Sequence, residues 1–167
     1  MKPENILLQT KEASDQFDIR NSRFEIKLTD FGIAKMLSLS QFMTICLAMG
    51  TPYYMAPEQK IDAAHVDQRA DIFSAGILLF ELVTGQVPFT ASAPMQVAYR
   101  HVHEDVPAPS PVRPGIPAGI DELVLRATRR NPDQRFGDAD AFLAAARVQK
   151  AQLPAAQPWA PSPTDTL

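Results

Sequence analysis

The alternation of apolar and polar residues predicts two short strands near the beginning of the chain. Within Phe24–Leu28, apolar residues alternate with Glu25 and Lys27, which is the period of a half-buried strand. Asn5–Gln9 also reads as a strand, and the two are expected to pair as a β-hairpin. The polar insert between them, residues 10–23, is long for a hairpin connection, so we expect a mobile loop there.

Helical patterns dominate the rest of the chain. The stretch from Asp67 to Gly85 has apolar residues almost all the way round a helix, and the final glycine ends it. We therefore expect this helix to be buried on every side. Three amphipathic helices are expected around it, the last of them beginning at Asp138, a typical N-cap residue. Their apolar stripes are Met95, Ala98, Tyr99 and Val102; Ile120, Leu123, Val124 and Ala127; and Ala139, Phe142, Leu143 and Ala146. The predicted fold class is mainly α with a small β-hairpin.

Composition and charge narrow the classes of protein and partner. With 46% hydrophobic and 21% charged residues, the chain can build an apolar core. Its net charge of −3 gives no reason to expect a nucleic acid or an anionic membrane surface as partner. The single cysteine, Cys46, excludes an internal disulfide framework and fits a reducing, cytoplasmic setting. The longest apolar stretch, Ile72–Val83, is too short to span a bilayer.

Two proline-rich segments are expected to lie outside the helices. The five prolines of residues 106–117 indicate an extended connector. Residues 151–167, rich in proline and alanine, have the composition of a disordered tail, so the predicted domain spans residues 1–150. His101 and His103, at the end of a predicted helix, are expected to be surface residues rather than metal ligands.

Three short stretches carry candidate chemistry: "KPEN" at 2–5, "DFG" at 30–32 and "APE" at 56–58. Each stretch alone is weak evidence for a function, because a chain terminus, a turn with a glycine and the start of a helix commonly have the same residues. Together, and in order with "GTPYYMAPEQ", "ADIFSAGILLFELVTGQVPF" and "RRNPDQRF", they resemble the second half of a protein kinase domain of the bacterial serine/threonine type. The resemblance runs from residue 1 to about residue 150. It implies a protein-kinase-like C-terminal lobe that lacks the N-terminal lobe.

The resemblance implies a site for ATP and Mg²⁺. Asn5 and Asp30 match the two magnesium ligands, and oxygen ligands suit this hard cation. Lys2 matches the lysine near the transferring phosphate, and Thr51 the threonine that contacts that lysine, which is the serine/threonine kinase pattern. Leu7 and its neighbours match the residues that cap the adenine. The implied catalytic residues are Lys2 and Thr51, and the implied cofactor-binding residues are Lys2, Asn5, Leu7 and Asp30.

Other matches imply scaffold roles. Glu58 is expected to pair with Arg135 and to hold the activation segment to the base of the lobe. Asp71 is expected to tie down the catalytic-loop backbone, with a plain N-cap as the alternative. Leu78 and Leu82 match residues that support the column beneath the adenine, with plain core residues as the alternative.

The resemblance also places an activation and substrate-docking segment at residues 33–56. Thr44 lies near the position at which related kinases are phosphorylated, and Ser38 and Ser40 are weaker candidates. A protein substrate or a kinase partner is expected to bind this segment and the helix surface of residues 92–103.

Parts of a complete kinase are not among these 167 residues. In the family, "KPEN" follows His-Arg-Asp and one apolar residue, so the catalytic aspartate would immediately precede Met1. The Gly-rich loop and the lysine that holds the α- and β-phosphates are also missing. The leading hypothesis is therefore a serine/threonine kinase that transfers the γ-phosphoryl of ATP in its intact domain, present here as a truncated C-lobe that is inactive alone.

The alternative hypothesis is a non-catalytic, pseudokinase-like binding or scaffold module that keeps only the docking surface. In both cases the all-round apolar helix is expected to lack one of its covering neighbours. Each large apolar side chain that stays exposed to solvent loses roughly 1.5–3 kcal/mol of stabilisation that burial would provide. We therefore expect the chain alone to be unstable, partly molten or prone to aggregation.

Overall fold

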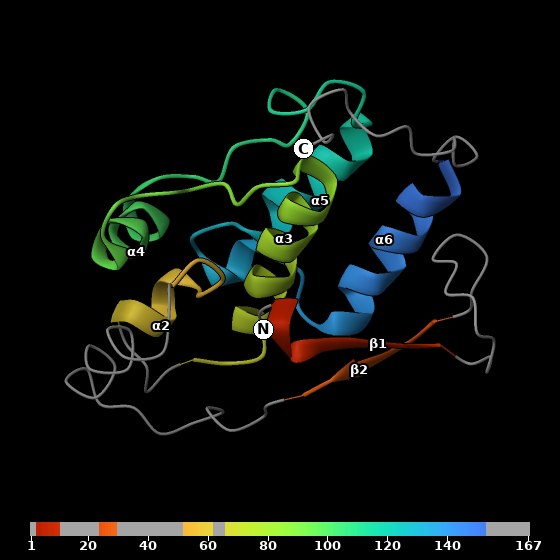
Figure 1. Ribbon diagram of the computed structural model, residues 1–167, viewed down its shortest axis with the longest axis horizontal. Coiled ribbons are helices and arrows are strands. Elements are labelled where there is room, and N and C mark those ends of the chain that lie inside the picture. Colours follow the sequence, from red (N-terminus) through yellow and green to blue (C-terminus); the bar gives the residue numbers. More distant parts are fainter. Residues whose placement is uncertain (1–2, 11–23, 30–51, 62–65, 153–167) are drawn as a thin grey trace, which may run out of the picture.

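The computed structural model describes residues 3–10, 24–29, 52–61 and 66–152 (Figure 1). These residues form a mainly helical structure with one small sheet, as the sequence predicts. The elements in chain order are the 3₁₀ turn η1 (Pro3–Asn5), β1 (Ile6–Thr10), β2 (Phe24–Leu28), α2 (Pro57–Ile61), α3 (Arg69–Thr84), α4 (Pro94–His103), α5 (Ala118–Ala127), the 3₁₀ turn η3 (Pro132–Gln134) and α6 (Ala139–Gln152).

The two strands form an antiparallel hairpin. Ile6 lies opposite Leu28, and Thr10 lies opposite Phe24. The second strand has its predicted bounds, and the first is shifted by one residue, since Asn5 belongs to η1. The alternation predicts a half-buried strand, but the Ile26 side chain is 66% exposed. An alternating pattern predicts a strand and its two faces, whereas the burial of either face depends on what packs against it.

Helix α3 runs through the middle of the described structure, with α5 beside it and α4 and α6 on opposite sides (Figure 1). It ends at Gly85, whose φ of 82° is left-handed and whose N–H donates to the Glu81 carbonyl at 2.7 Å. The expectation that α3 is buried on every side is wrong for one face. Leu82 is 71% exposed, and Leu78 is only half-buried.

Two apolar clusters hold the helices together. The first joins α3 to the chain just before α2, to α4 and to the residues around Phe89, and its largest buried members are Phe73, Ile77 and Phe80. The second joins α3 to α5 and the start of α6. Close approach of α3 and α5 depends on Gly76, because a Cβ added there would lie 2.8 Å from the Ala127 Cβ.

The predicted apolar stripes differ in accuracy. All four residues of the α5 stripe are buried, as expected. The α4 stripe is only partly correct. Ala98 is buried as predicted, but Met95 and Tyr99 are 44% and 62% exposed, and Val97 and His101 are buried instead. In α4 two overlapping stripes satisfy helical spacing, and aromatic contacts with the buried His101 accompany the observed one.

The last helix and the proline connector keep only part of the expected structure. Asp138 caps α6, since its Oδ1 accepts from the Ala141 N–H at 2.7 Å, but Leu143 remains 45% exposed. The connector is not extended throughout, because the N–H groups of Val112 and Arg113 both donate to the Pro109 carbonyl at 3.0 Å. In the part of the chain that the structure describes, no helix combines the length and apolar character needed to cross a membrane.

Candidate functional site

One corner of the candidate site lies where the hairpin begins and ends. The Thr29 N–H donates to the Asn5 carbonyl at 2.8 Å, and the Thr29 hydroxyl lies 3.4 Å from the same oxygen. Thr29 immediately precedes Asp30 in the chain. The antiparallel register thus brings Asn5 to the residue that leads into Asp30. An amide oxygen and a carboxylate are donors that suit Mg²⁺, so the residue types at this corner fit the ion.

Several predicted site residues lie outside the described residues, and the roles assigned to them remain predictions. They are Lys2, Asp30, Ser38, Ser40, Thr44 and Thr51. Leu7, predicted to cap the adenine, lies in β1 with 51% of its surface exposed. Its side chain is therefore open to a contact from outside the described residues.

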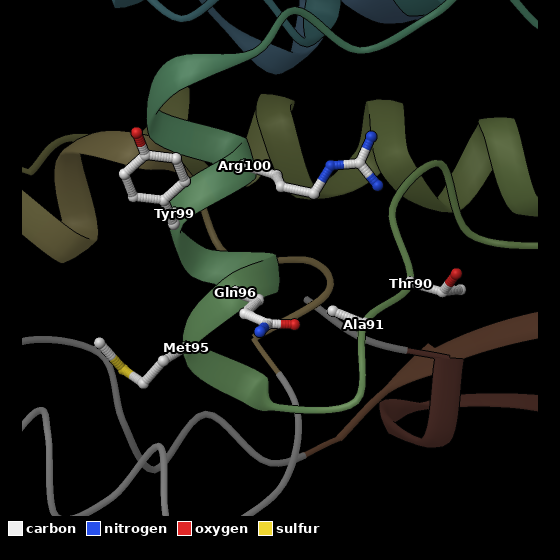
Figure 2. A pocket seen from close by; sticks show the side chains of 6 residues that line it. All are labelled: Thr90, Ala91, Met95, Gln96, Tyr99 and Arg100. Atoms are coloured by element: carbon white, nitrogen blue, oxygen red, sulfur yellow. The ribbon is translucent and has the colours of Figure 1, made fainter.

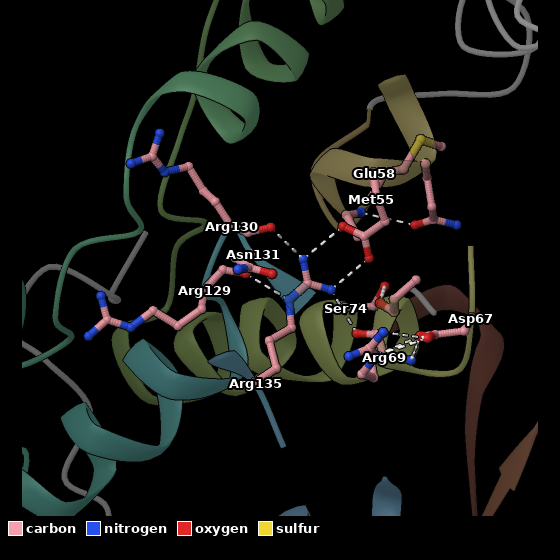
Figure 3. A network of polar contacts seen from close by, with 12 residues as sticks. Met55, Glu58, Asp67, Arg69, Ser74, Arg129, Arg130, Asn131 and Arg135 are labelled. Carbon is pink, nitrogen blue, oxygen red and sulfur yellow. Dashed lines mark hydrogen bonds and ion pairs between the residues drawn. The ribbon is translucent and has the colours of Figure 1, made fainter. Parts of the chain in front are cut away.

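Arg135 and Glu58 form a buried, bidentate ion pair (Figure 3). The two guanidinium NH groups donate to the two carboxylate oxygens of Glu58 at 2.6 and 2.7 Å. The remaining donors reach the carbonyl oxygens of Arg69 at 2.9 Å, Arg129 at 2.7 Å and Arg130 at 3.1 Å. The five N–H groups of a guanidinium thus match five acceptors, which is the condition for burying this charge at tolerable cost.

This ion pair joins the start of α2 to the loop before α6. The Arg135 side chain is fully buried and its guanidinium lies 5.0 Å from the centre of the Phe73 ring in α3. Glu58 belongs to the Ala-Pro-Glu motif, so the pair fastens this motif to the helical core. The contact therefore has the geometry of a structural anchor rather than that of a reacting group.

Tyr54 is anchored to α3 at two points that sequence reasoning missed. Its carbonyl accepts from the Ser74 hydroxyl at 2.7 Å, and its own hydroxyl donates to Glu81 Oε2 at 2.7 Å. Burial and the Glu81 carboxylate raise the pKa of Tyr54 above its usual range. The phenol consequently stays protonated and keeps donating at physiological pH. No pattern in the sequence pairs residues so far apart.

The start of α2 has a cap that the sequence does indicate. Pro57 occupies the first helical position, and Gln59 Oε1 accepts from the Ala56 N–H at 2.9 Å. A glutamine at the third helical position that reaches back to the N-cap is one half of a capping box. The chain is therefore held on both sides of the Ala-Pro-Glu motif.

His101 is buried, contrary to the sequence-based expectation. It is 1% exposed and lies between the rings of Phe73 and Phe89, with centroids 5.4 Å away in each case. Its Nδ1 lies 2.8 Å from Lys60 Nζ and 3.1 Å from the Met55 carbonyl oxygen. Burial, together with the Lys60 cation, lowers the pKa of His101 to about 3. The surface assignment failed because a helix can bury one polar residue among apolar ones if neighbours supply partners.

His101 and His103 occupy different environments in the described structure. His103 is exposed and its ring stacks against that of Tyr99, with a centroid distance of 4.1 Å. Across the described ranges, no three histidine, cysteine, aspartate or glutamate side chains gather closely enough to hold a metal ion.

Asp71 lies exposed in the first turn of α3, three residues after the N-cap Gln68. It is therefore not the N-cap, although a carboxylate in the first turn interacts favourably with the helix dipole. The proposed role in tying down the catalytic loop stays a prediction.

A shallow, mainly apolar hollow lies on the exposed side of α4 (Figure 2). Its floor and rim come from α4 and from the chain just before it, and its lining residues are Thr90, Ala91, Met95, Gln96, Tyr99 and Arg100. The Arg100 guanidinium lies 4.3 Å from the centre of the Phe89 ring and pairs with Glu104 at 2.8 Å. The hollow overlaps the surface of residues 92–103 that is predicted to bind a protein partner, because its four α4 residues belong to that surface.

Comparison with known proteins agrees with the motifs. The family model of the protein kinase domain matches residues 1–148. The serine/threonine-protein kinase PknL of Mycobacterium tuberculosis is 39% identical over 142 residues, which cover 85% of this chain and 32% of PknL. PknB of Mycobacterium leprae is 37% identical over 158 residues, covering 93% of this chain and 23% of PknB. PksC of Streptomyces coelicolor is 47% identical over 96 residues, covering 58% of this chain and 17% of PksC.

The chain spans about a third or less of the length of these curated relatives. The matched residues nevertheless include nearly all of the described structure, from the hairpin to most of α6. The chain therefore belongs to the protein kinase family and groups with its bacterial serine/threonine kinases.

Proposed function

We propose that this chain forms part of a serine/threonine kinase that transfers the γ-phosphoryl group of ATP to a Ser or Thr hydroxyl of a protein. The observation that carries the proposal is the junction between Asn5 and Thr29. Through the backbone carbonyl of Asn5, it brings this residue to the one before Asp30, and Asn5 and Asp30 are the magnesium ligands expected in this family.

In this proposal, Asn5 and Asp30 hold the magnesium ion, which supplies neutralisation of the phosphate charge when bound. Lys2 adds a positive charge near the transferring group, and Thr51 orients that lysine. Leu7 presents an apolar surface to the adenine, in keeping with its exposed position on β1.

The protein substrate binds the chain around Pro52–Ala56 and the exposed side of α4. The bonds from Ser74 and Glu81 to Tyr54 support this assignment, because they give the segment a fixed shape against α3. A fixed docking surface lowers the entropic cost of aligning the hydroxyl with the phosphate. The reaction takes place in the cytoplasm, where ATP is available.

In this proposal the 167 residues alone transfer no phosphoryl group, because they contain neither the catalytic aspartate nor the Gly-rich loop of a complete kinase domain. The test compares this chain with a fusion in which the preceding part of the PknL kinase domain is joined to Met1. Both are incubated with γ-labelled ATP, Mg²⁺ and a generic basic protein. An Asp30→Ala variant of each serves as the control.

We expect label transfer by the fusion, loss of that transfer in its Asp30→Ala variant, and no transfer by the shorter chain. Transfer by the shorter chain that Asp30→Ala abolishes would overturn the claim of inactivity. A folded fusion that transfers no label would overturn the kinase proposal and favour the non-catalytic binding module.

A further inference from the structure

A buried imidazole joins three separate parts of the structure. His101 comes from α4, Lys60 from α2, and Met55 from the chain just before the Ala-Pro-Glu motif. Phe73 of α3 and Phe89 enclose the ring. Neither the Asn5–Thr29 junction nor the Arg135–Glu58 ion pair involves His101.

The ring is neutral whichever of its two contacts it makes. When the proton is on Nε2, Nδ1 accepts from the Lys60 ammonium, and when the proton is on Nδ1 it donates to the Met55 carbonyl. The charged groups that act on the ring are Lys60 from α2 and Arg100 from α4, and both are cations. A second proton on the ring would therefore add a third positive charge to a dry environment.

A purely apolar packing role does not account for a histidine here. Its Nε2 is buried and has no hydrogen-bond partner in the described part of the chain, which is a cost that leucine at this position would avoid. The polar contacts of Nδ1 are what a leucine would lose. They reach the turn in which the Met55 N–H approaches the Pro52 carbonyl at 3.4 Å.

The same helix carries the candidate docking hollow on its opposite side. Met95 and Tyr99 are exposed there (Figure 2). His101, by contrast, is buried, and its Nδ1 lies 3.1 Å from the Met55 carbonyl oxygen. The contact of His101 with Met55 thus links the helix that carries the hollow to the turn at residues 52–56.

We propose that His101 is a positioning residue for substrate binding, which holds the Pro52–Ala56 turn against α4 so that both parts of the docking surface keep one geometry. The inference rests on the proposed kinase function, because only that function makes this surface a substrate site. His101 acts through Met55 and does not touch the reacting atoms.

The test uses three variants of the active fusion described above. His101→Asn keeps a polar atom near the position of Nδ1, whereas His101→Leu keeps the approximate volume and removes both polar contacts. Leu123→Ala in the second apolar cluster is a control for lost stability, because Leu123 is buried between α5 and its neighbours. The measured quantities are kcat, the KM for the protein substrate and the KM for ATP.

We expect His101→Leu to raise the KM for the protein about tenfold, the size expected for the loss of one buried hydrogen bond, with an unchanged KM for ATP. His101→Asn, which keeps a polar atom near Nδ1, should leave the KM for the protein close to the wild-type value. An unchanged protein KM in His101→Leu, or an equal rise in Leu123→Ala, would overturn the positioning role.

Amide hydrogen exchange of residues 53–59 separates this inference from the kinase proposal, because it needs no activity. Faster exchange at these residues in His101→Leu, with near-normal exchange in His101→Asn, supports the positioning of the turn even if no phosphoryl transfer is found. Exchange that is unchanged at these residues in both variants would overturn it.

Discussion

Arg135 and Glu58 are 77 residues apart in the sequence, yet the Arg135 guanidinium donates hydrogen bonds to both carboxylate oxygens of Glu58. The pair ties the Ala-Pro-Glu motif to the loop before α6, beneath the segment that we propose to dock substrate. Its burial makes it sensitive to the loss of either partner, because the remaining charge keeps no ionic partner in a dry environment.

Glu58→Ala should lower the free energy of unfolding by about 3–5 kcal/mol, the range seen when one member of a buried pair is removed. Chemical denaturation followed by circular dichroism measures this loss. Asp133→Ala is the matched control, since Asp133 pairs with Arg69 at 2.6 Å but is 79% exposed, and exposed pairs contribute only ~0–1 kcal/mol. Equal effects of the two variants would contradict the anchoring role.

Acid should destabilise the fold through His101. In the folded chain the pKa of His101 is about 3, whereas in the unfolded chain it is near 6.5. Between these two pH values the unfolded state therefore binds more protons than the folded state. The stabilising contribution is complete above pH 6.5 and is lost as the pH falls towards 3. The slope from this residue approaches about 1.4 kcal/mol for each pH unit.

Unfolding free energies measured at several pH values between 7.5 and 5 test this expectation. The His101→Leu variant should show a shallower dependence on pH than the wild-type chain over that interval. Parallel curves would mean that His101 does not carry the acid sensitivity.

Gly76→Ala should loosen the contact between α3 and α5. The added Cβ would lie 2.7 Å from Thr128 Cγ2 and 2.8 Å from the Ala127 Cβ, so the helices must separate. Overpacking of this kind costs about 1–3 kcal/mol, which a shift in the thermal midpoint would report. Gly137→Ala is the control, because a Cβ there meets nothing within 4 Å. A Gly76 variant as stable as the Gly137 variant would contradict the close approach.

Leu82→Lys should change the stability of the 167-residue chain by no more than about 0.5 kcal/mol and reduce its self-association. The reason is that Leu82 is 71% exposed on an otherwise apolar helix, where it offers other molecules a hydrophobic surface. Light scattering during heating measures the association.

Ile77→Ala on the same helix provides the contrast. Ile77 is fully buried, so its truncation should cost about 2–5 kcal/mol. A comparable loss in Leu82→Lys would show that Leu82 is covered in solution.

The sequence correctly predicted features that depend on a few neighbouring residues. The alternation around Ile26 predicted β2, Gly85 predicted the end of α3, and Asp138 predicted the cap of α6. Each depends on backbone geometry or on bonds within a few residues, and such information lies in a short window of sequence.

Motif order went further, because it identified a kinase domain and predicted that Glu58 meets Arg135 although no local rule links them. For Glu58 and Arg135, the family resemblance rather than periodicity carried this long-range information. The proximity of Asn5 to the end of β2 follows instead from the expected pairing of the two strands, and the Asn5–Thr29 bond has that arrangement up to the residue before Asp30.

The sequence by itself therefore determined the family, the order of helices and strands and the stripe that α5 buries. Only the tertiary structure decided which side of α4 faces the core, that Leu82 stays exposed, and that His101 lies buried against Met55. Helical spacing allows more than one buried face, and burial depends on side chains from distant segments. The partners of Tyr54 and His101 come from elements 20 to 46 residues away, so only the folded chain brings them together.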